Sequence, residues 1–209
     1  MTAKTYSSDD LDVHFDLKRC IHAGVCVKQK PEVFDIKARP WIQPGNAPAS
    51  DLVAVVESCP SGALQYTRRG DGEAEVGSPR NQVQITADGQ LEFRGRLQWE
   101  GQTLLRAALC RCGASQNKPF CDNAHKGSGF ADDGLPDAGD VDDAGLGGGL
   151  ACAAFPDGPL HLSGGVEVLA ADGEVIFRGE QTWLCRCGQS ANKPFCDGAH
   201  KREGWTSAN

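Results

Sequence analysis

Residues 110–125 read Cys110-Arg-Cys-Gly-Ala-Ser-Gln-Asn-Lys-Pro-Phe-Cys-Asp-Asn-Ala-His125, and residues 185–200 read Cys185-Arg-Cys-Gly-Gln-Ser-Ala-Asn-Lys-Pro-Phe-Cys-Asp-Gly-Ala-His200. Both stretches have the spacing Cys-x-Cys-x8-Cys-x3-His, and most of the residues between the ligand-type positions are the same. The C-terminal part of the chain therefore contains an internal repeat. It provides two candidate metal sites, the first formed by Cys110, Cys112, Cys121 and His125 and the second by Cys185, Cys187, Cys196 and His200.

The sequence before each stretch is repeated as well. The segment Ala87-Asp-Gly-Gln-Leu-Glu-Phe-Arg-Gly95 is similar to Pro156-Asp-Gly-Pro-Leu-His-Leu-Ser-Gly164. Each is followed by an alternating apolar pattern, a turn and a second such pattern that leads into Cys-x-Cys. The turns, at Glu100-Gly101 and Asp172-Gly173, are typical of β-hairpins. We therefore expect two hairpins, each leading into a metal-binding loop that is followed by a short helix.

The ligand spacing suggests how each loop could hold a metal. Cys-x-Cys brings two thiolates close together, and Cys-x3-His is expected to place the third thiolate and the imidazole on one face of the short helix. Asp122 and Asp197 follow the third cysteine, where a carboxylate can cap open N–H groups. Asn123 and Gly198 suit a backbone position with positive φ. Three thiolates and one imidazole can bind either zinc or an iron–sulfur cluster, and the spacing alone leaves both open.

The two stretches resemble the CDGSH iron–sulfur family, also called mitoNEET-like, over about residues 81–209. The second copy ends in Cys-Asp-Gly-Ala-His, and the first departs at Asn123, which is not a ligand position. The resemblance implies a 2Fe–2S cluster held by three cysteines and one histidine in each copy. Two motifs in one chain imply the tandem branch of the family, in which the copies pair about a pseudo-two-fold axis. It also implies that Lys118 and Lys193 lie near the clusters, and the alternative that they are ordinary solvated surface lysines stays open.

A second group of cysteines lies in the N-terminal part of the chain. It begins with Cys20-Ile-His-Ala-Gly-Val-Cys26 and ends with Cys59-Pro-Ser-Gly-Ala-Leu64, after a helical stretch from Ser50 to Ser58 whose apolar face carries Leu52, Val55 and Val56. A closing Cys-Pro is typical of bacterial ferredoxins. The segment resembles a divergent branch of single-cluster ferredoxins.

This N-terminal unit departs from the ferredoxin pattern at the usual middle cysteine, which is Ala23 here. Cys20, Cys26 and Cys59 suit a 3Fe–4S cluster, or a 4Fe–4S cluster whose fourth iron is bound by His22 or by solvent. Two alternatives remain open at this point: His22 as an ordinary surface residue, and a unit that folds with three thiols and no cluster.

The predicted fold class is α+β, with a small ferredoxin-like domain followed by a β-rich tandem domain with pseudo-two-fold symmetry. Six segments are expected along the chain. They are a disordered terminus (1–10), the ferredoxin-like domain (11–69), a linker (70–80), the first repeat (81–130), an acidic, glycine-rich connection (131–155) and the second repeat (156–209).

Composition narrows the function classes. The formal charge of −7 argues against nucleic-acid binding, which needs a basic surface. No apolar run is long enough to span a bilayer, and the first residues lack a signal-peptide pattern, so we expect a cytoplasmic protein without a membrane anchor. Nine of the ten cysteines fall into three clusters with a nearby histidine, and such clusters in a cytosolic chain bind metal more often than they form disulfides.

The functional expectation is a non-enzymatic protein with two 2Fe–2S clusters and a third 3Fe–4S or 4Fe–4S cluster, acting in electron transfer or in redox or pH sensing. Its partner would be a redox protein or an apo-protein acceptor, and we expect a monomer because the tandem repeat replaces a homodimer. Two alternatives are cluster storage and transfer to apo-proteins, and a structural zinc module. The sequence shows no pattern typical of a nucleophile–base pair or of a phosphate-binding loop, so we do not expect catalysis.

Overall fold

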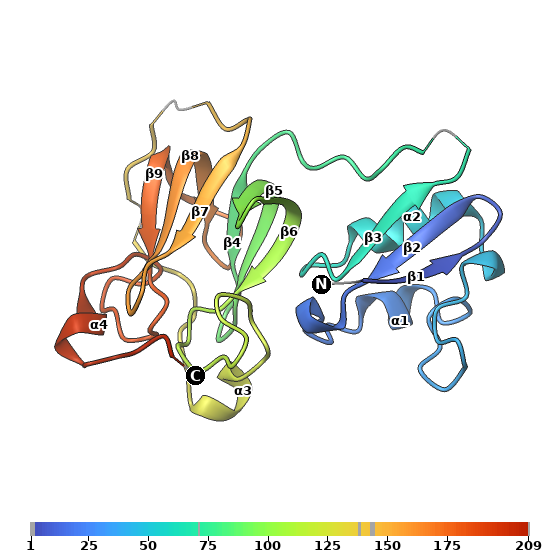
Figure 1. The fold of residues 1–209 in the computed structure, drawn as a ribbon. Helices are drawn as coiled ribbons and strands as arrows, with labels where there is room; N and C mark the ends of the chain where they lie inside the picture. The colour runs from blue at the N-terminus through green and yellow to red at the C-terminus, as the bar shows by residue number, and fades with distance from the viewer. Residues whose placement is uncertain (1–2, 71, 138, 143–144, 209) are drawn as a thin grey trace. The chain divides into compact units, whose positions relative to one another are not determined.

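The computed structural model describes residues 3–70, 72–137, 139–142 and 145–208. The chain divides into two compact units, Met1–Val76 and Gly77–Asn209, which are described separately (Figure 1). Both contain strands and short helices, in agreement with the α+β prediction. No helix in the described part of the chain combines the length and the apolar character that a membrane crossing requires.

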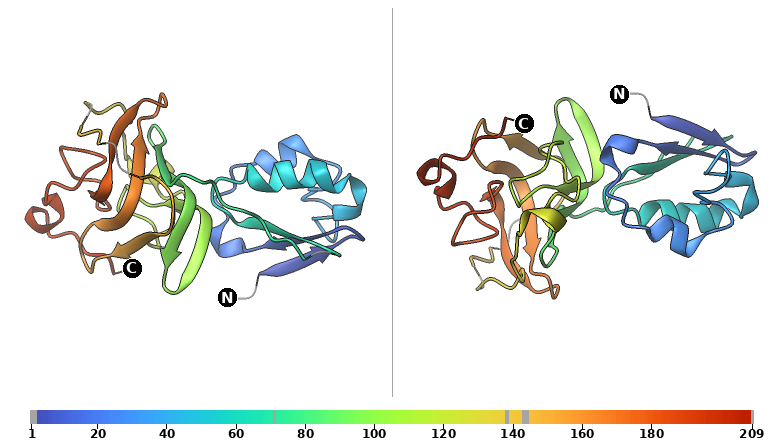
Figure 2. Two further views of the ribbon diagram at one scale, coloured as in Figure 1. Left: turned by 90° about the horizontal axis from the view of Figure 1, so that it is seen from above. Right: turned by 90° about the horizontal axis from the view of Figure 1, so that it is seen from below.

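The N-terminal unit is a three-stranded antiparallel sheet with a helix on one face. Strands β1 (Lys4–Ser7), β2 (Leu11–Phe15) and β3 (Leu64–Arg68) lie in that order. Helix α2 (Ala49–Glu57) covers the sheet (Figure 2), and its predicted apolar residues Leu52, Val55 and Val56 are all buried in the core. The chain between β2 and α2 contains two 3₁₀ turns, η1 (Leu17–Arg19) and η2 (Pro44–Asn46), and the short helix α1 (Val25–Gln29).

Strand β1 corrects the prediction that residues 1–10 are disordered. Residues Lys4–Ser7 pair with β2 in a regular antiparallel register, and Tyr6 is buried in the core. The segment has few apolar residues, so its sequence shows little of this pairing, which depends on the edge that β2 offers. Residues 1–2 of that predicted terminus lie outside the described residues.

The C-terminal unit contains the same order of elements twice. The first copy has β4 (Gln82–Ile85), β5 (Leu91–Trp99), β6 (Gln102–Leu109) and α3 (His125–Ser128). The second has β7 (Leu150–Ala154), β8 (Leu160–Leu169), β9 (Val175–Leu184) and α4 (Ala199–Arg202). Strands β5 and β6 form the first predicted hairpin, and β8 and β9 form the second. Glu100 and Gly101 both have positive φ in the first turn, as a tight hairpin turn requires.

The two copies are joined through their strands into one sheet (Figure 1). Strand β4 pairs antiparallel with β5 of its own copy and parallel with β8 of the other. Strand β7 likewise pairs antiparallel with β8 and parallel with β5. Each copy thus adds its first strand to the second strand of the other copy. Apolar side chains from the strands of both copies form one core, which includes Phe93, Leu97, Leu150, Leu162 and Val168.

Strand β7 also corrects the predicted connection over residues 131–155, because Leu150–Ala154 is an integral strand of the sheet. The second copy therefore begins before residue 156. Part of the acidic stretch is ordered as well: Gly139 N–H donates to Ile176 O, and Arg178 N–H donates to Asp140 O. Residue 71 of the predicted linker and residues 138, 143 and 144 of the connection lie outside the described residues.

Candidate metal centres

The first two thiols of each repeated site lie side by side at the end of a hairpin. Strand β6 leads into Cys110 and Cys112, whose Sγ atoms are 3.7 Å apart, and β9 leads into Cys185 and Cys187 with the same separation. The loop returns to the strand end in both copies, because Cys110 N–H donates to Pro119 O and Cys185 N–H to Pro194 O. The hairpin and the returning loop therefore fix the position of the thiol pair.

The third cysteine and the histidine form a second pair in each site. Cys121 Sγ lies 3.5 Å from His125 Nδ1, and Cys196 Sγ lies 3.5 Å from His200 Nδ1. The predicted common helix is wrong: α3 begins only at His125 and α4 only at Ala199, so both cysteines precede the helix. The turn between them needs positive φ, which Asn123 (70°) and Gly198 (83°) supply as expected.

The four donors of each site are thus arranged as two pairs rather than around one point. In the part of the chain that the structure describes, no three side chains of the metal-binding types are gathered closely enough to hold a single ion. Each site therefore offers its donors two at a time, a thiol pair and a thiol with an imidazole.

Burial and mutual contact shift the thiol pKa values. The hydrogen bond from Cys112 lowers the pKa of Cys110 to about 6 and raises that of Cys112. Burial raises the pKa of Cys121 to about 11 and that of Cys187 to about 11. Burial also lowers the pKa of His125, which favours the neutral imidazole that a metal requires. A bound cation would offset the burial penalty and deprotonate the remaining thiols.

The aspartate that follows the third cysteine closes the loop around each site. Asp122 accepts hydrogen bonds from Gln116 N–H and Ala124 N–H, and Asp197 accepts from Ala191 N–H and Ala199 N–H. Burial opposes ionisation of Asp122, but these bonds outweigh it and lower its pKa. Both carboxylates therefore bind open N–H groups, as predicted.

Lys118 and Lys193 fold back onto their own loops. The Lys118 ammonium donates to Ser115 O, and the Lys193 ammonium donates to Ser190 O at 2.6 Å. Each also reaches the other copy: Lys118 Nζ lies 6.0 Å from the centre of the Trp205 ring, and Lys193 Nζ lies 3.8 Å from Asp132 Oδ2. These two lysines therefore link the two site loops.

The arginine between the paired cysteines is a functional residue that the sequence did not reveal. Arg111 and Arg186 are only 1% and 4% exposed. Arg111 donates to Gly89 O and Thr86 O, and Arg186 donates to the corresponding carbonyls of Gly158 and Phe155. Each guanidinium therefore ties its Cys-x-Cys segment to the turn before the hairpin. The repetition of Cys-Arg-Cys in both copies was the available signal.

The two site loops touch each other across the unit. A Cβ atom at Gly113 would lie 2.4 Å from Cys187 O, and one at Gly188 would lie 2.6 Å from Cys112 O. Both glycines also have positive φ, 83° and 80°. Each Cys-x-Cys-Gly turn therefore packs against the other, and a side chain at either glycine would collide with backbone.

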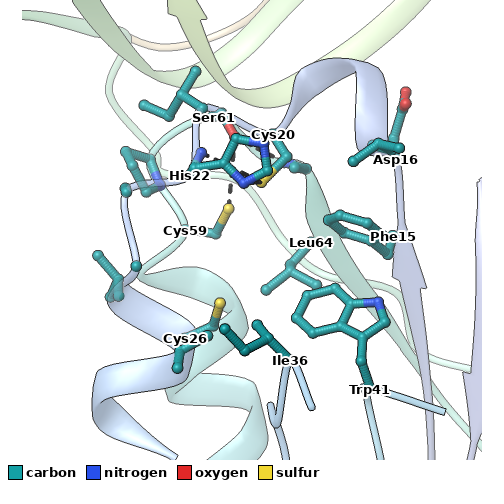
Figure 3. Close-up of a pocket in the computed structure, with 18 of the residues that line it drawn as sticks. Phe15, Asp16, Cys20, His22, Cys26, Ile36, Trp41, Cys59, Ser61 and Leu64 are labelled. Atoms are coloured by element: carbon teal, nitrogen blue, oxygen red, sulfur yellow. Dashed lines mark hydrogen bonds between the residues drawn. The ribbon is translucent and has the colours of Figure 1, made fainter. Parts of the chain in front are cut away.

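The N-terminal unit brings its three cysteines to one cavity of about 1040 Å³ (Figure 3). Cys20 follows η1, Cys26 lies in α1, and Cys59 follows α2. Burial raises the pKa of Cys20 and of Cys26, and in both the nearby Cys59 adds to the increase. Apolar side chains make up much of the wall, among them Phe15, Ile36, Trp41 and Leu64.

His22 lines the same cavity and lies beside Cys20, with Nδ1 3.9 Å from Cys20 Sγ (Figure 3). Its backbone has a φ of 50°, uncommon for a residue other than glycine, and its own N–H donates to Cys20 Sγ at 3.4 Å. The turn thus directs the imidazole toward the thiols. The cavity wall therefore carries three thiols and one imidazole.

Comparisons with known proteins agree with this division. Residues 6–69 match the family model described as divergent 4Fe-4S mono-cluster, and residues 72–126 and 157–201 match the model described as iron-binding zinc finger, CDGSH type. The chain is similar to the uncharacterized protein YjdI of Escherichia coli (strain K12), with 36% identity over 66 residues, or 32% of this chain and 87% of YjdI. The YjdI protein of Escherichia coli O157:H7 matches with the same identity and coverage.

Proposed function

Since the chain belongs to the CDGSH iron-binding family and carries a divergent 4Fe–4S domain before its two CDGSH motifs, we propose that it is an electron-transfer protein with three iron–sulfur clusters. The observation that carries the proposal is the arrangement of donors in pairs. Each CDGSH site has a Cys–Cys pair at 3.7 Å and a Cys–His pair at 3.5 Å. A 2Fe–2S cluster takes two ligands on each of its irons, and these pairs supply them.

When bound, such clusters supply reversible one-electron chemistry. The residues of this chain hold and tune that chemistry. One imidazole in place of a thiolate removes negative charge from the ligand set and so favours the reduced state. Burial of Cys110, Cys121, Cys185 and His125 excludes water from most of the ligand shell. Arg111 and Arg186, each between two ligand cysteines, place positive charge near the ligands, and Asp132 offsets part of that charge at Arg111.

For the N-terminal site we propose a 4Fe–4S cluster held by Cys20, Cys26, Cys59 and His22. The three thiols alone would suit a 3Fe–4S cluster, and the position of His22 Nδ1 beside Cys20 Sγ adds the fourth donor. The family description of a 4Fe-4S mono-cluster supports the same assignment. If His22 is the fourth ligand, His22→Ala should convert part of the cluster to the 3Fe–4S form, visible by electron paramagnetic resonance of the oxidised protein.

The surroundings of the N-terminal cavity suit an acidic redox partner. Among the described residues, the cavity wall includes Lys4, Lys18 and Lys28 but only one carboxylate, Asp16. Leu17 and Ile36, on the same wall, are 66% and 65% exposed. An apolar surface surrounded by positive charge favours short-lived docking of a protein with acidic residues around its own redox centre. We expect the protein to act as a monomeric carrier rather than as an enzyme.

We also propose that the two CDGSH copies are related by a pseudo-two-fold axis. The exchanged strand pairings β4–β8 and β5–β7 support it, as do the matching contacts of Gly113 with Cys187 and of Gly188 with Cys112. A pair related in this way would bring its two clusters into one unit and make electron exchange between them short-range.

Cluster donation to apo-proteins is a second candidate function. It is favoured by the partial exposure of Cys112 and Cys196, one ligand in each site, which gives an incoming thiol access. Incubation of the loaded protein with an apo-ferredoxin distinguishes the two functions. A donor transfers iron and sulfide within minutes, whereas a carrier keeps its clusters and exchanges only electrons.

The test of the proposed function is iron, sulfide and zinc quantitation of the protein purified without oxygen, together with electron paramagnetic resonance before and after reduction. We expect iron and sulfide in equal amounts, a red-brown absorbance that bleaches on reduction, and separate 2Fe–2S and 4Fe–4S signals. Zinc in place of iron, with no sulfide, would identify a structural zinc module and overturn the proposal.

A further inference from the structure

The two CDGSH sites differ at one charged position next to their buried arginines. Arg111 and Arg186 donate to corresponding backbone carbonyls, and each guanidinium lies over an aromatic ring, Phe130 at 5.0 Å and Trp205 at 5.2 Å. The two arginines therefore have equivalent carbonyl and aromatic neighbours in the two copies. A difference in their contacts is a difference between the two sites.

The residue two positions beyond each ring occupies the same place in both copies. Asp132 N–H donates to Asp88 Oδ1 at 2.7 Å, and Ser207 N–H donates to Asp157 Oδ1 at 2.6 Å. Asp132 and Ser207 are thus equivalent in backbone position, although one carries a carboxylate and the other a hydroxyl.

The side chains at this position bind different partners. Asp132 Oδ1 lies 2.5 Å from Arg111 Nη1, in an ion pair whose side chains are 15% and 1% exposed. The Ser207 hydroxyl instead donates to Asp157 Oδ1 at 2.9 Å. Within the described residues, the structure gives Arg186 no ion pair. The Arg111 guanidinium is therefore in direct contact with a carboxylate, whereas Asp157 acts on Arg186 without a direct ion pair.

We propose that Asp132 is a positioning and charge-setting residue that makes the two CDGSH sites inequivalent, so that their clusters accept electrons at different potentials. A negative charge close to a cluster opposes electron uptake, and the low dielectric of a buried ion pair weakens the screening of that charge. Asp132 Oδ2 also lies 3.8 Å from Lys193 Nζ of the other copy, so Asp132 contacts both site loops. The second copy has Ser207 at the equivalent position and therefore lacks this carboxylate. The inference rests on the proposed function, since it requires a cluster in each site.

The test is an anaerobic redox titration of the full chain, followed by electron paramagnetic resonance of the 2Fe–2S signals, with dithionite supplying one electron to each cluster. Wild type should show two separate midpoint potentials. Asp132→Asn removes the charge but keeps the shape, and should bring the two potentials closer together. Asp133→Asn is the matched control, because Asp133 is the exposed neighbour whose carboxylate accepts from Leu135 N–H, and it should leave the separation unchanged.

An exchange of the two residues tests the same idea in the other direction. Ser207→Asp supplies the missing carboxylate beside Arg186 and should also reduce the separation. The double variant D132S/S207D should restore it, with the charge moved to the other site. Thermal unfolding of each variant identifies any that fails to fold, and Asp132→Asn then carries the test alone.

The outcomes separate this inference from the proposed function. A protein with no iron overturns the proposed function itself. A protein with iron and sulfide whose two 2Fe–2S centres titrate at one potential overturns only the inequivalence. Two potentials whose separation is the same in Asp132→Asn as in Asp133→Asn overturn the role of Asp132.

Discussion

The N-terminal site and the two CDGSH sites gather their donors in different ways. Cys20 follows η1, Cys26 lies in α1 and Cys59 follows α2, which packs on the sheet, and all three face a cavity of about 1040 Å³. Each CDGSH site takes all its donors from one loop, and a buried arginine and a glycine contact from the other copy hold that loop. The N-terminal site therefore depends on the core of its unit, whereas the two CDGSH sites depend on local loops and on the pairing of the copies.

The largest effect should come from removing one donor, which tests whether the sites are independent. Cys121→Ser should abolish the first CDGSH cluster and lower the iron content by about two ions per chain. The N-terminal signal should be unchanged, because its donors belong to the other unit. Metal analysis and electron paramagnetic resonance measure both. Cys152→Ser is the control, since Cys152 lies in strand β7 outside the three donor sets and burial raises the pKa of its thiol to about 12. Loss of the N-terminal signal in Cys121→Ser would contradict the comparison.

A core substitution should affect the N-terminal site alone. Leu52 of α2 is fully buried against the sheet. Leu52→Ala should lower the free energy of unfolding of this unit by about 2–5 kcal/mol and accelerate loss of its cluster, because α2 sets the position of Cys59. Denaturant unfolding followed by absorbance measures both changes. Val53→Ala, on the half-buried side of the helix, should cost less. Equal loss of all three clusters would contradict the idea that only the N-terminal cluster depends on the core of the N-terminal unit.

A small side chain between the copies should disturb both CDGSH sites together. Gly113→Ala places a Cβ 2.4 Å from Cys187 O at a positive φ, and should destabilise the C-terminal unit by roughly 2–4 kcal/mol. Gly129→Ala has a similar φ of 74° but open space around the Cβ, so only about 1–2 kcal/mol is expected there. Thermal unfolding compares the two. If they are equal, the contact between the loops contributes nothing beyond backbone strain.

The smallest effect concerns Glu167, a buried carboxylate that is paired with Arg178 of its own copy and bonded to Gln82 of the other, and it has a defined pH dependence. Burial would raise the pKa of Glu167, but hydrogen bonds from Gln82 of the first copy and from Arg178 lower it below the ordinary 4.5. Its stabilisation is therefore complete above that value and is lost as the pH falls through the lowered pKa. Glu167→Gln should cost about 1–3 kcal/mol near neutral pH.

Urea unfolding at several pH values tests this prediction. The difference between wild type and Glu167→Gln should shrink in acid, whereas the exposed Glu174→Gln should show no difference at any pH. A difference that stays constant into acid would mean that the charge of Glu167 contributes nothing.

The sequence predicted the parts of the molecule whose chemistry is local. The hairpin turns depend on Glu100-Gly101 and Asp172-Gly173, the ligand loops on a fixed spacing, and the tolerance for Asn123 on one backbone angle. It did not predict β7, because Leu150–Ala154 contains no β-branched or aromatic residue and becomes a strand only between β5 and β8.

The cysteine and histidine donors were also predicted better from the sequence than the side chains packed around them. Arginine is usually a surface residue, so nothing in the pattern showed that Arg111 and Arg186 would be buried. Asp132 is one aspartate among many in an acidic stretch of sequence, and its ion pair depends on a turn that begins at Asp88. The common helix for Cys121 and His125 was wrong because an i, i+4 spacing also fits a turn with positive φ followed by a helix start.

The exchanged strands have a consequence for how the molecule could be divided. Each copy contributes its first strand to the hairpin of the other, and both share one core. A cut in the backbone between the copies would therefore leave most of the contacts that join them. The two halves, produced as separate chains, should find each other and rebuild the sheet. Cluster colour on mixing would then report fragment complementation, and one half could be labelled or mutated without the other.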